Sequence, residues 1–175
     1  LSRLAQTEQR ARERDLRLGD DERVADRLAL ELLDRLVEPI DEDRLEAWPD
    51  FFSADGRYLV TTAENVAQGL PLGIMSATSR AMLRDRIKAL RQANVYEAQR
   101  YRHVLGTPRI EAANGTLRAR TSFMVARIMH TGETMLFATG RYQDEIVFAD
   151  GEARFAEKTV ILDSRLIDTL LAIPL

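Results

Sequence analysis

The residues of this sequence that are best suited to proton transfer are His103, Asp55 and Tyr58. A histidine that shares an apolar pocket with a carboxyl or phenol group can act as a general acid or base, because desolvation moves the pKa of such groups toward neutral pH. Arg102, next to His103, would add a positive charge. The competing interpretation is structural: Asp55 lies at a turn, Tyr58 packs within a strand, and Arg102 pairs with Asp85 or Glu97. The residue types alone allow both interpretations.

The two histidines of the sequence, His103 and His130, could also bind a metal ion. A mononuclear iron site uses two histidines and one carboxylate that converge on the metal, and Asp85 or Asp144 could supply the carboxylate. The spacing of these residues is not typical of a ligand motif, so we expect no metal or cofactor site in this chain. Cysteine is absent, which excludes a Rieske [2Fe–2S] cluster, because that cluster needs two cysteines and two histidines.

The composition excludes several classes of partner. A net charge of −3, with both signs interspersed, provides no basic surface for nucleic acid. Nucleotide-binding glycine motifs are missing from the sequence. No apolar run reaches the roughly 18 residues of a membrane helix, and the first residues lack the apolar stretch of a secretion signal. We therefore expect a cytoplasmic protein with no nucleic-acid and no membrane partner.

Helical periodicity organises the first half of the chain. Apolar residues recur at helical spacing over residues 24–36, and the helix is predicted to end before Pro39. Asp41 can cap a second, shorter helix, and Ser79 can cap a third. The third helix is predicted to bury a stripe that consists of Met82, Leu83, Ile87 and Leu90.

The second half of the chain is predicted to be strands. Asn114-Gly115, Thr131-Gly132-Glu133 and Asp150-Gly151 are turn signals between runs of alternating residues. The predicted strands span residues 57–62, 72–75, 104–112, 116–129, 134–148 and 152–162. Helices followed by long hairpin-connected strands indicate an α+β domain. We expect this single domain to cover residues 23–175, after a charged N-terminal arm at residues 1–22.

The run Arg100-Tyr101-Arg102-His103 could also form a subunit interface. Arginine and tyrosine are enriched at the residues that dominate binding energy. Alternation along a strand would point Tyr101 and His103 to one side and Arg100 and Arg102 to the other. The later strands add three further interface candidates, namely Arg127, Arg141 and Tyr142.

Over residues 23–175 the sequence resembles the small (β) subunits of aromatic-ring-hydroxylating dioxygenases, most of all those of terephthalate dioxygenases. The segments that carry the resemblance are WPDFF (48–52), RYRHVLG (100–106), RIMHTGET (127–134) and DTLLAIPL (168–175). The resemblance implies a cone like that of nuclear transport factor 2, with a curved antiparallel sheet and N-terminal helices packed on its concave face.

The resemblance also implies a non-catalytic, structural role. The partner would be a large (α) subunit that carries a Rieske cluster and a mononuclear Fe(II), with the two subunits forming an α3β3 hexamer on a β trimer. Electrons from NAD(P)H would arrive through a reductase, sometimes with a ferredoxin, for cis-dihydroxylation of an aromatic carboxylate such as terephthalate or benzoate. The alternative is a stand-alone dehydratase or isomerase that uses His103 with Asp55 or Tyr58. An open cavity lined by these side chains would favour the alternative, and a cone filled by packed apolar side chains would count against it.

Overall fold

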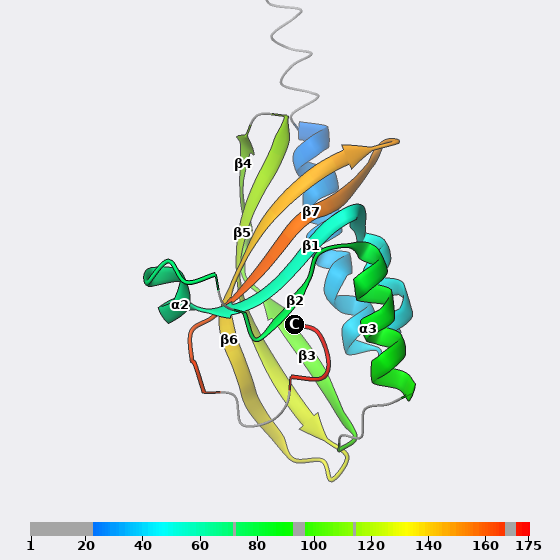
Figure 1. The fold of residues 1–175 in the computed structure, drawn as a ribbon, viewed down its shortest axis with the longest axis vertical. Coiled ribbons are helices and arrows are strands. Elements are labelled where there is room, and N and C mark those ends of the chain that lie inside the picture. Colours follow the sequence, from blue (N-terminus) through cyan, green and yellow to red (C-terminus); the bar gives the residue numbers. More distant parts are fainter. Residues whose placement is uncertain (1–22, 72, 93–96, 114, 167–170) are drawn as a thin grey trace, which may run out of the picture.

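The computed structural model describes residues 23–71, 73–92, 97–113, 115–166 and 171–175. In this part of the chain a seven-stranded sheet curves strongly around a shared core. The helices at residues 23–41, 45–51 and 80–92 lie together on one side of the sheet, and the short helix at residues 63–67 lies apart from them (Figure 1). The predicted α+β class is confirmed. The predicted N-terminal arm at residues 1–22 lies outside the described residues.

The first helix is described over residues 23–41 and buries Leu32, Leu33 and Leu36 against the concave side of the sheet. It continues two residues past Pro39, so the predicted end before this proline is wrong. A proline in the last turn removes only one backbone donor, which a helix tolerates there better than in its interior. No helix of the described residues is long and apolar enough to cross a membrane.

The next helices differ from prediction in detail. Asp41 does not cap a second α-helix: a 3-10 helix, η1 (Leu45–Phe51), follows it, and α2 (Ala63–Ala67) comes after the first strand. The predicted cap of α3 (Arg80–Gln92) is confirmed, because the Ser79 Oγ accepts the Met82 N–H at 3.2 Å. Met82 itself is exposed, so its predicted place in the buried stripe is wrong.

The sheet has the strand order β2-β1-β7-β6-β5-β3, and β4 also pairs with β5. The strands are β1 (Phe52–Thr62), β2 (Met75–Ala77), β3 (Gln99–Leu105), β4 (Arg109–Ala113), β5 (Thr116–Met129), β6 (Thr134–Ala149) and β7 (Glu152–Leu162). The predicted strands at residues 116–129 and 152–162 are confirmed, and Asp150 and Gly151 both have the positive φ of a two-residue hairpin turn. The predicted strand at residues 104–112 is instead parts of β3 and β4, separated by Gly106 and Pro108.

One strand pair corrects the expectation of an entirely antiparallel sheet. β1 runs parallel to β7, whereas the other pairs are antiparallel. Hairpin turns make successive strands antiparallel, but a long connection leaves the direction free. The segment after β1 includes α2, β2 and α3 before the meander begins, so β1 can lie beside β7 in the same direction.

Candidate functional site

The first polar pair inside the cone joins Asp41, at the end of the first helix, to His103 on the inner face of β3. The Asp41 carboxylate lies 2.6 Å from the His103 Nδ1 and accepts the His103 backbone N–H at 3.0 Å. The His103 side chain is fully buried, and its Nε2 has no hydrogen-bond partner among the described residues. A carboxylate in this position orients the imidazole ring and fixes its tautomer, which is the arrangement of a general base.

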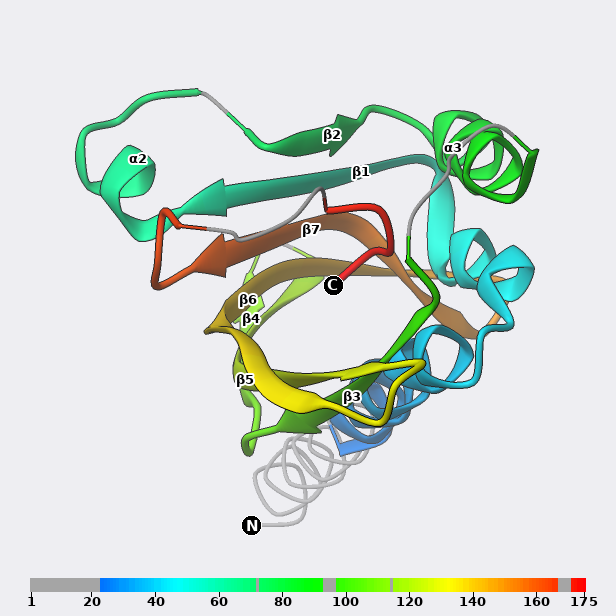
Figure 2. The same ribbon diagram turned by 90° about the horizontal axis from the view of Figure 1, so that it is seen from below.

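Residues 171–175 pack inside the cone. Figure 2 shows the C-terminal segment entering the space that the curved strands enclose. Residues 171–175 are all buried. The Tyr58 hydroxyl donates to the Leu175 carbonyl and accepts the Leu175 N–H, both at 3.0 Å. A packed apolar segment of the chain itself therefore occupies part of this interior.

The second interior pair joins Asp144 on β6 to Lys158 on β7. These residues face each other in the strand register, with Nζ–carboxylate distances of 3.2 and 3.3 Å, and neither side chain is exposed. The Lys158 Nζ also lies 3.5 Å from the centre of the Tyr142 ring. Burial raises the pKa of Asp144 to about 6, although the nearby Lys158 opposes this shift, and burial lowers the pKa of Lys158.

We expect the Asp144 carboxyl group to titrate near pH 6, as its raised pKa implies. An unperturbed aspartate titrates near pH 3.9. Because folding raises this pKa, the folded chain binds the proton more tightly than the unfolded chain. The contribution of Asp144 to the free energy of unfolding therefore falls as the pH rises from about 4 to about 6. Carboxyl ¹³C NMR, with Asp144→Asn to assign the resonance, measures the titration; a midpoint below pH 4.5 would contradict it.

The structure separates the residues that were predicted to line an active site. His103 and Tyr58 lie inside the cone, but Asp55 is exposed on β1, so its predicted place in the cone lining is wrong. His130 lies at the exposed turn after β5 and contacts Glu97 at 3.3 Å, so the two histidines are not brought together. Among the described residues, no group of three His, Asp or Glu side chains is placed to hold a metal ion.

The predicted interface residues fall on two faces of the sheet, as strand alternation requires. Arg100 and Arg102 are exposed on the outer face of β3, and Arg141 is half-buried on the outer face of β6. The other three lie inside, so in this structure they cannot belong to an outer interface. Tyr101 and Tyr142 are each 1% exposed, and Arg127 is 4% exposed with its guanidinium 4.8 Å from the centre of the Phe137 ring.

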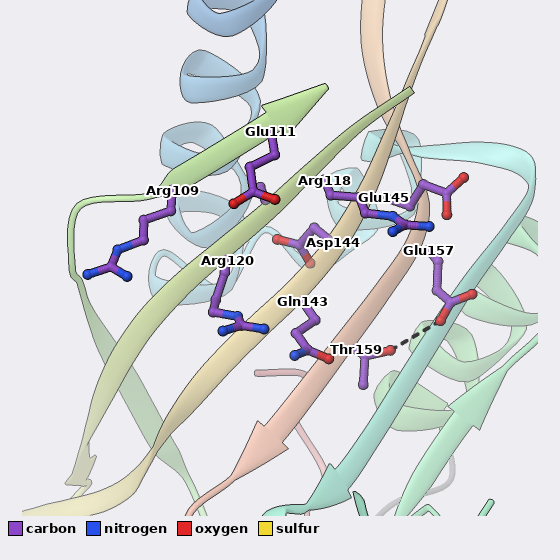
Figure 3. Close-up of a pocket in the computed structure, with 10 residues that line it drawn as sticks. Arg109, Glu111, Arg118, Arg120, Gln143, Asp144, Glu145, Glu157 and Thr159 are labelled. Carbon is purple, nitrogen blue, oxygen red and sulfur yellow. Dashed lines mark hydrogen bonds between the residues drawn. The ribbon is translucent and has the colours of Figure 1, made fainter. Parts of the chain in front are cut away.

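The outer face of the sheet has a polar half, which contains a hollow of about 480 Å³. Figure 3 shows Arg109, Arg120, Gln143 and Thr159 along one line, in agreement with their register across β4, β5, β6 and β7. Arg109 and Arg120 are directly opposite each other, and neither forms an ion pair within the part of the chain that is described. Like charges in such positions are unfavourable without a partner. Glu111, Glu145 and Glu157 line the same hollow, so this half of the face carries both signs of charge.

The other half of the outer face is apolar. We call Val104, Met124, Ala126 and Leu136 the apolar patch; Val104 is opposite Met124, and Ala126 is opposite Leu136. Arg102 is opposite Ala126 in the same register, so arginine lies beside the patch. The outer face of β5 thus changes from basic to apolar along its length.

A second apolar surface lies on the helix side of the β3 edge. We call it the helix groove: a hollow of about 400 Å³ lined by Leu30, Glu31, Leu33, Asp34, Leu105, Gly106 and Pro108. Glu31 and Asp34 are exposed and place two carboxylates at this groove. Neither this groove nor the polar hollow is lined by His103, Tyr58 or Asp55.

Sequence reasoning missed two interior partners, Asp41 and Lys158. Asp41 was assigned to a helix cap, and nothing local connects it with a histidine 62 residues away. The second pair did have a signal in the sequence, because every second residue of a strand points to the same face. On β6, Asp144 and Tyr142 share the inner face with the apolar Ile146, and on β7 Lys158 shares it with Val160.

Comparisons with known proteins agree on one family. The chain matches the model of the SnoaL-like domain over residues 22–159. It is 51% identical over 137 residues to terephthalate 1,2-dioxygenase, terminal oxygenase component subunit beta 1, of Comamonas sp., a match that covers 78% of this chain and 89% of the relative. It is 37% identical over 145 residues to the anthranilate 1,2-dioxygenase small subunit of Burkholderia cepacia, over 82% of this chain and 90% of that one.

A solved structure gives the same result for the fold. A protein from Novosphingobium aromaticivorans, assigned as the β subunit of an aromatic-ring-hydroxylating dioxygenase, superposes with a TM-score of 0.80 at 35% sequence identity. The match covers 88% of this chain and 99% of the other. The cone fold that the family resemblance implied is thereby confirmed, with the one parallel strand pair described above as its correction.

Proposed function

We propose that this chain, which belongs to the small (β) subunits of aromatic-ring-hydroxylating dioxygenases within the SnoaL-like domain family, is the non-catalytic scaffold of such an enzyme. The observation that carries the proposal is the closed cone. Residues 171–175 are buried inside it, and the polar groups Asp41, His103, Asp144 and Lys158 form pairs there. The exposed apolar and basic surfaces lie outside, where a partner subunit would bind.

The redox chemistry would belong to a large (α) subunit. A Rieske cluster needs two cysteines, and this sequence contains none, so its residues do not fit that cluster. The α subunit would also hold the mononuclear Fe(II), and electrons would come from NAD(P)H through a reductase, with or without a ferredoxin. The complex would be an α3β3 hexamer on a β trimer in the cytoplasm. Kinship with subunits named for terephthalate and anthranilate dioxygenases suggests an aromatic carboxylate as substrate.

The test is the mass and iron content of the full chain, purified alone and after co-expression with the large-subunit candidate from the same source. We expect a metal-free assembly of the chain alone, and an iron-containing complex of both chains at equal stoichiometry after co-expression. Analytical ultracentrifugation measures the masses, and elemental analysis measures the iron. A chain whose mass is unchanged by the large subunit would contradict the proposal.

Arg100→Ala should weaken the two-chain complex about fivefold or more, as truncation of an interface arginine commonly does. Arg100 is exposed on β3, so the fold should be unaffected. Lys88→Ala is the matched control, since Lys88 is an exposed cation on α3. Co-purification yield at fixed expression level measures the effect. Equal yields from both variants would remove Arg100 from the interface. Tyr101→Ala would test the core instead, because Tyr101 is buried.

The stand-alone acid–base enzyme has one observation in its favour, the orientation of His103 by Asp41. Catalysis would also require substrate to reach the His103 Nε2. That atom is buried, and residues 171–175 of the chain itself are packed inside the cone, where Leu175 bonds to Tyr58. We therefore prefer the scaffold.

A further inference from the structure

We propose that the apolar patch of one copy docks into the helix groove of a second copy, so that copies of this chain associate head to tail. The inference deepens the proposed function: it rests on the β trimer suggested there and names the two surfaces that would form it.

The apolar patch is more exposed than an ordinary strand surface. Val104 is 54% exposed, Met124 is 47% exposed and Leu136 is 65% exposed. The strand register places these side chains next to one another, together with Ala126. A contiguous exposed surface of this kind on a folded domain marks an interaction site, whereas single exposed hydrophobic residues do not.

The helix groove offers a concave apolar surface of matching chemistry. Leu30 is 44% exposed at the groove, with Leu33 beneath it and Leu105 and Pro108 on the opposite side. Such a hollow, on the order of 400 Å³, can accept one or two protruding side chains. Leu136, the most exposed member of the patch, is the best candidate to enter it.

The charges around the two surfaces are of opposite sign. Arg100 and Arg102 lie beside the patch. Arg100 forms no ion pair with any described residue, and Arg102 pairs with Asp41 at 3.8 Å. At the groove, Asp34 likewise forms no ion pair within the described ranges, and Glu31 has only the exposed Arg27, at 3.5 Å. Complementary charges of this kind orient an association and select the partner.

The two surfaces lie on different sides of the sheet edge, so a copy that uses its patch still has a free groove. Contacts between two different surfaces are heterologous, and they either close into a ring or continue as a filament. A ring of three copies is the arrangement that corresponds to the proposed β trimer. In it, each copy would donate one patch and accept another.

Charge exchange in the full chain tests this contact. Arg100→Glu alone and Asp34→Arg alone should each weaken self-association about tenfold or more, because like charges would then meet. The double variant Arg100→Glu/Asp34→Arg should recover the association of the wild type, because the two charges are again opposite. Leu136→Asp should abolish the association in every background. Lys88→Glu is the control for a charge reversal elsewhere. Sedimentation equilibrium measures the masses, and circular dichroism with the thermal midpoint verifies folding.

Three results would overturn the inference: a wild-type chain that stays monomeric at all concentrations, single variants that associate normally, or a double variant that is not rescued. Its failure is distinguishable from that of the proposed function. Normal co-purification of the wild-type chain with the large subunit, together with an unchanged mass of the single variants, would refute only the contact. A rescued double variant together with no binding of a large subunit would refute only the scaffold role.

Discussion

Replacement of Lys158 by alanine is expected to lower the free energy of unfolding by about 3–5 kcal/mol, the usual cost of breaking a buried ion pair by removing one partner. The Asp144 carboxylate would stay buried without its counter-charge, since neither side chain is exposed. The variant would also lose the contact between the Lys158 Nζ and the Tyr142 ring, 3.5 Å from its centre. Equilibrium unfolding in urea, followed by far-UV circular dichroism at one fixed protein concentration, measures the change.

The double variant Asp144→Leu/Lys158→Met separates the pair from its surroundings. Apolar residues of similar volume remove both charges at once, and such replacements are often neutral or stabilising by about 1–4 kcal/mol. We therefore expect the double variant to be at least as stable as the wild type. Arg27→Ala, which removes the exposed Arg27–Glu31 pair, should change stability by less than about 1 kcal/mol. A Lys158→Ala loss as small as that of Arg27→Ala would refute the argument.

Replacement of Trp48 by alanine is expected to cost about 3–5 kcal/mol of stability, as for other buried aromatic residues. Trp48 is fully buried, and its ring meets Phe52 and Tyr58 edge to face, with centroid distances of 5.2 and 4.9 Å. Its Nε1 has no hydrogen-bond partner among the described residues, so the loss would come from packing. Because Tyr58 in turn binds Leu175, the variant should also loosen the C-terminal segment.

Trp48→Phe is the matched control for this prediction. A phenyl ring keeps part of the edge-to-face contact and leaves a smaller cavity, so its loss should be clearly less than that of Trp48→Ala. Urea unfolding by far-UV circular dichroism compares the two variants, since the only tryptophan is removed in both. Hydrogen exchange at residues 171–175 measures the loosening of the C-terminal segment. Equal losses for both variants would show that the aromatic contact contributes little.

These expectations divide the molecule into two regions with separate roles. Changes inside the cone, at Trp48 or Lys158, should alter stability first and assembly only as a consequence. Changes on the outer face, at Arg100 or Leu136, should alter assembly and leave stability near that of the wild type, as surface substitutions usually do. Comparing both properties for each variant therefore tests whether the interior serves the fold and the exterior serves the partners.

Elements whose signals are local could be predicted before the fold was known. Strand alternation and the Asp150-Gly151 turn predicted β7 and its neighbour closely, because a two-residue repeat and a positive-φ turn act within a few residues. Ser79 was recognised as a helix cap for the same reason. Alternation also predicted that Tyr101 and His103 share a face opposite to Arg100 and Arg102, although not which face would be the interior.

The contacts between distant segments became apparent only in the folded chain. The parallel pairing of β1 with β7, the Asp41–His103 pair and the hydrogen bonds from Tyr58 to Leu175, 117 residues away, have no local signal. Each of these residues is equally compatible with a turn, a cap or a surface. Their roles arise because the curved sheet encloses an interior in which buried polar groups need hydrogen-bond partners. The partner is the polar side chain or backbone group that the fold brings next to them. The same curvature turns the complementary surfaces outward, where they are available to another chain.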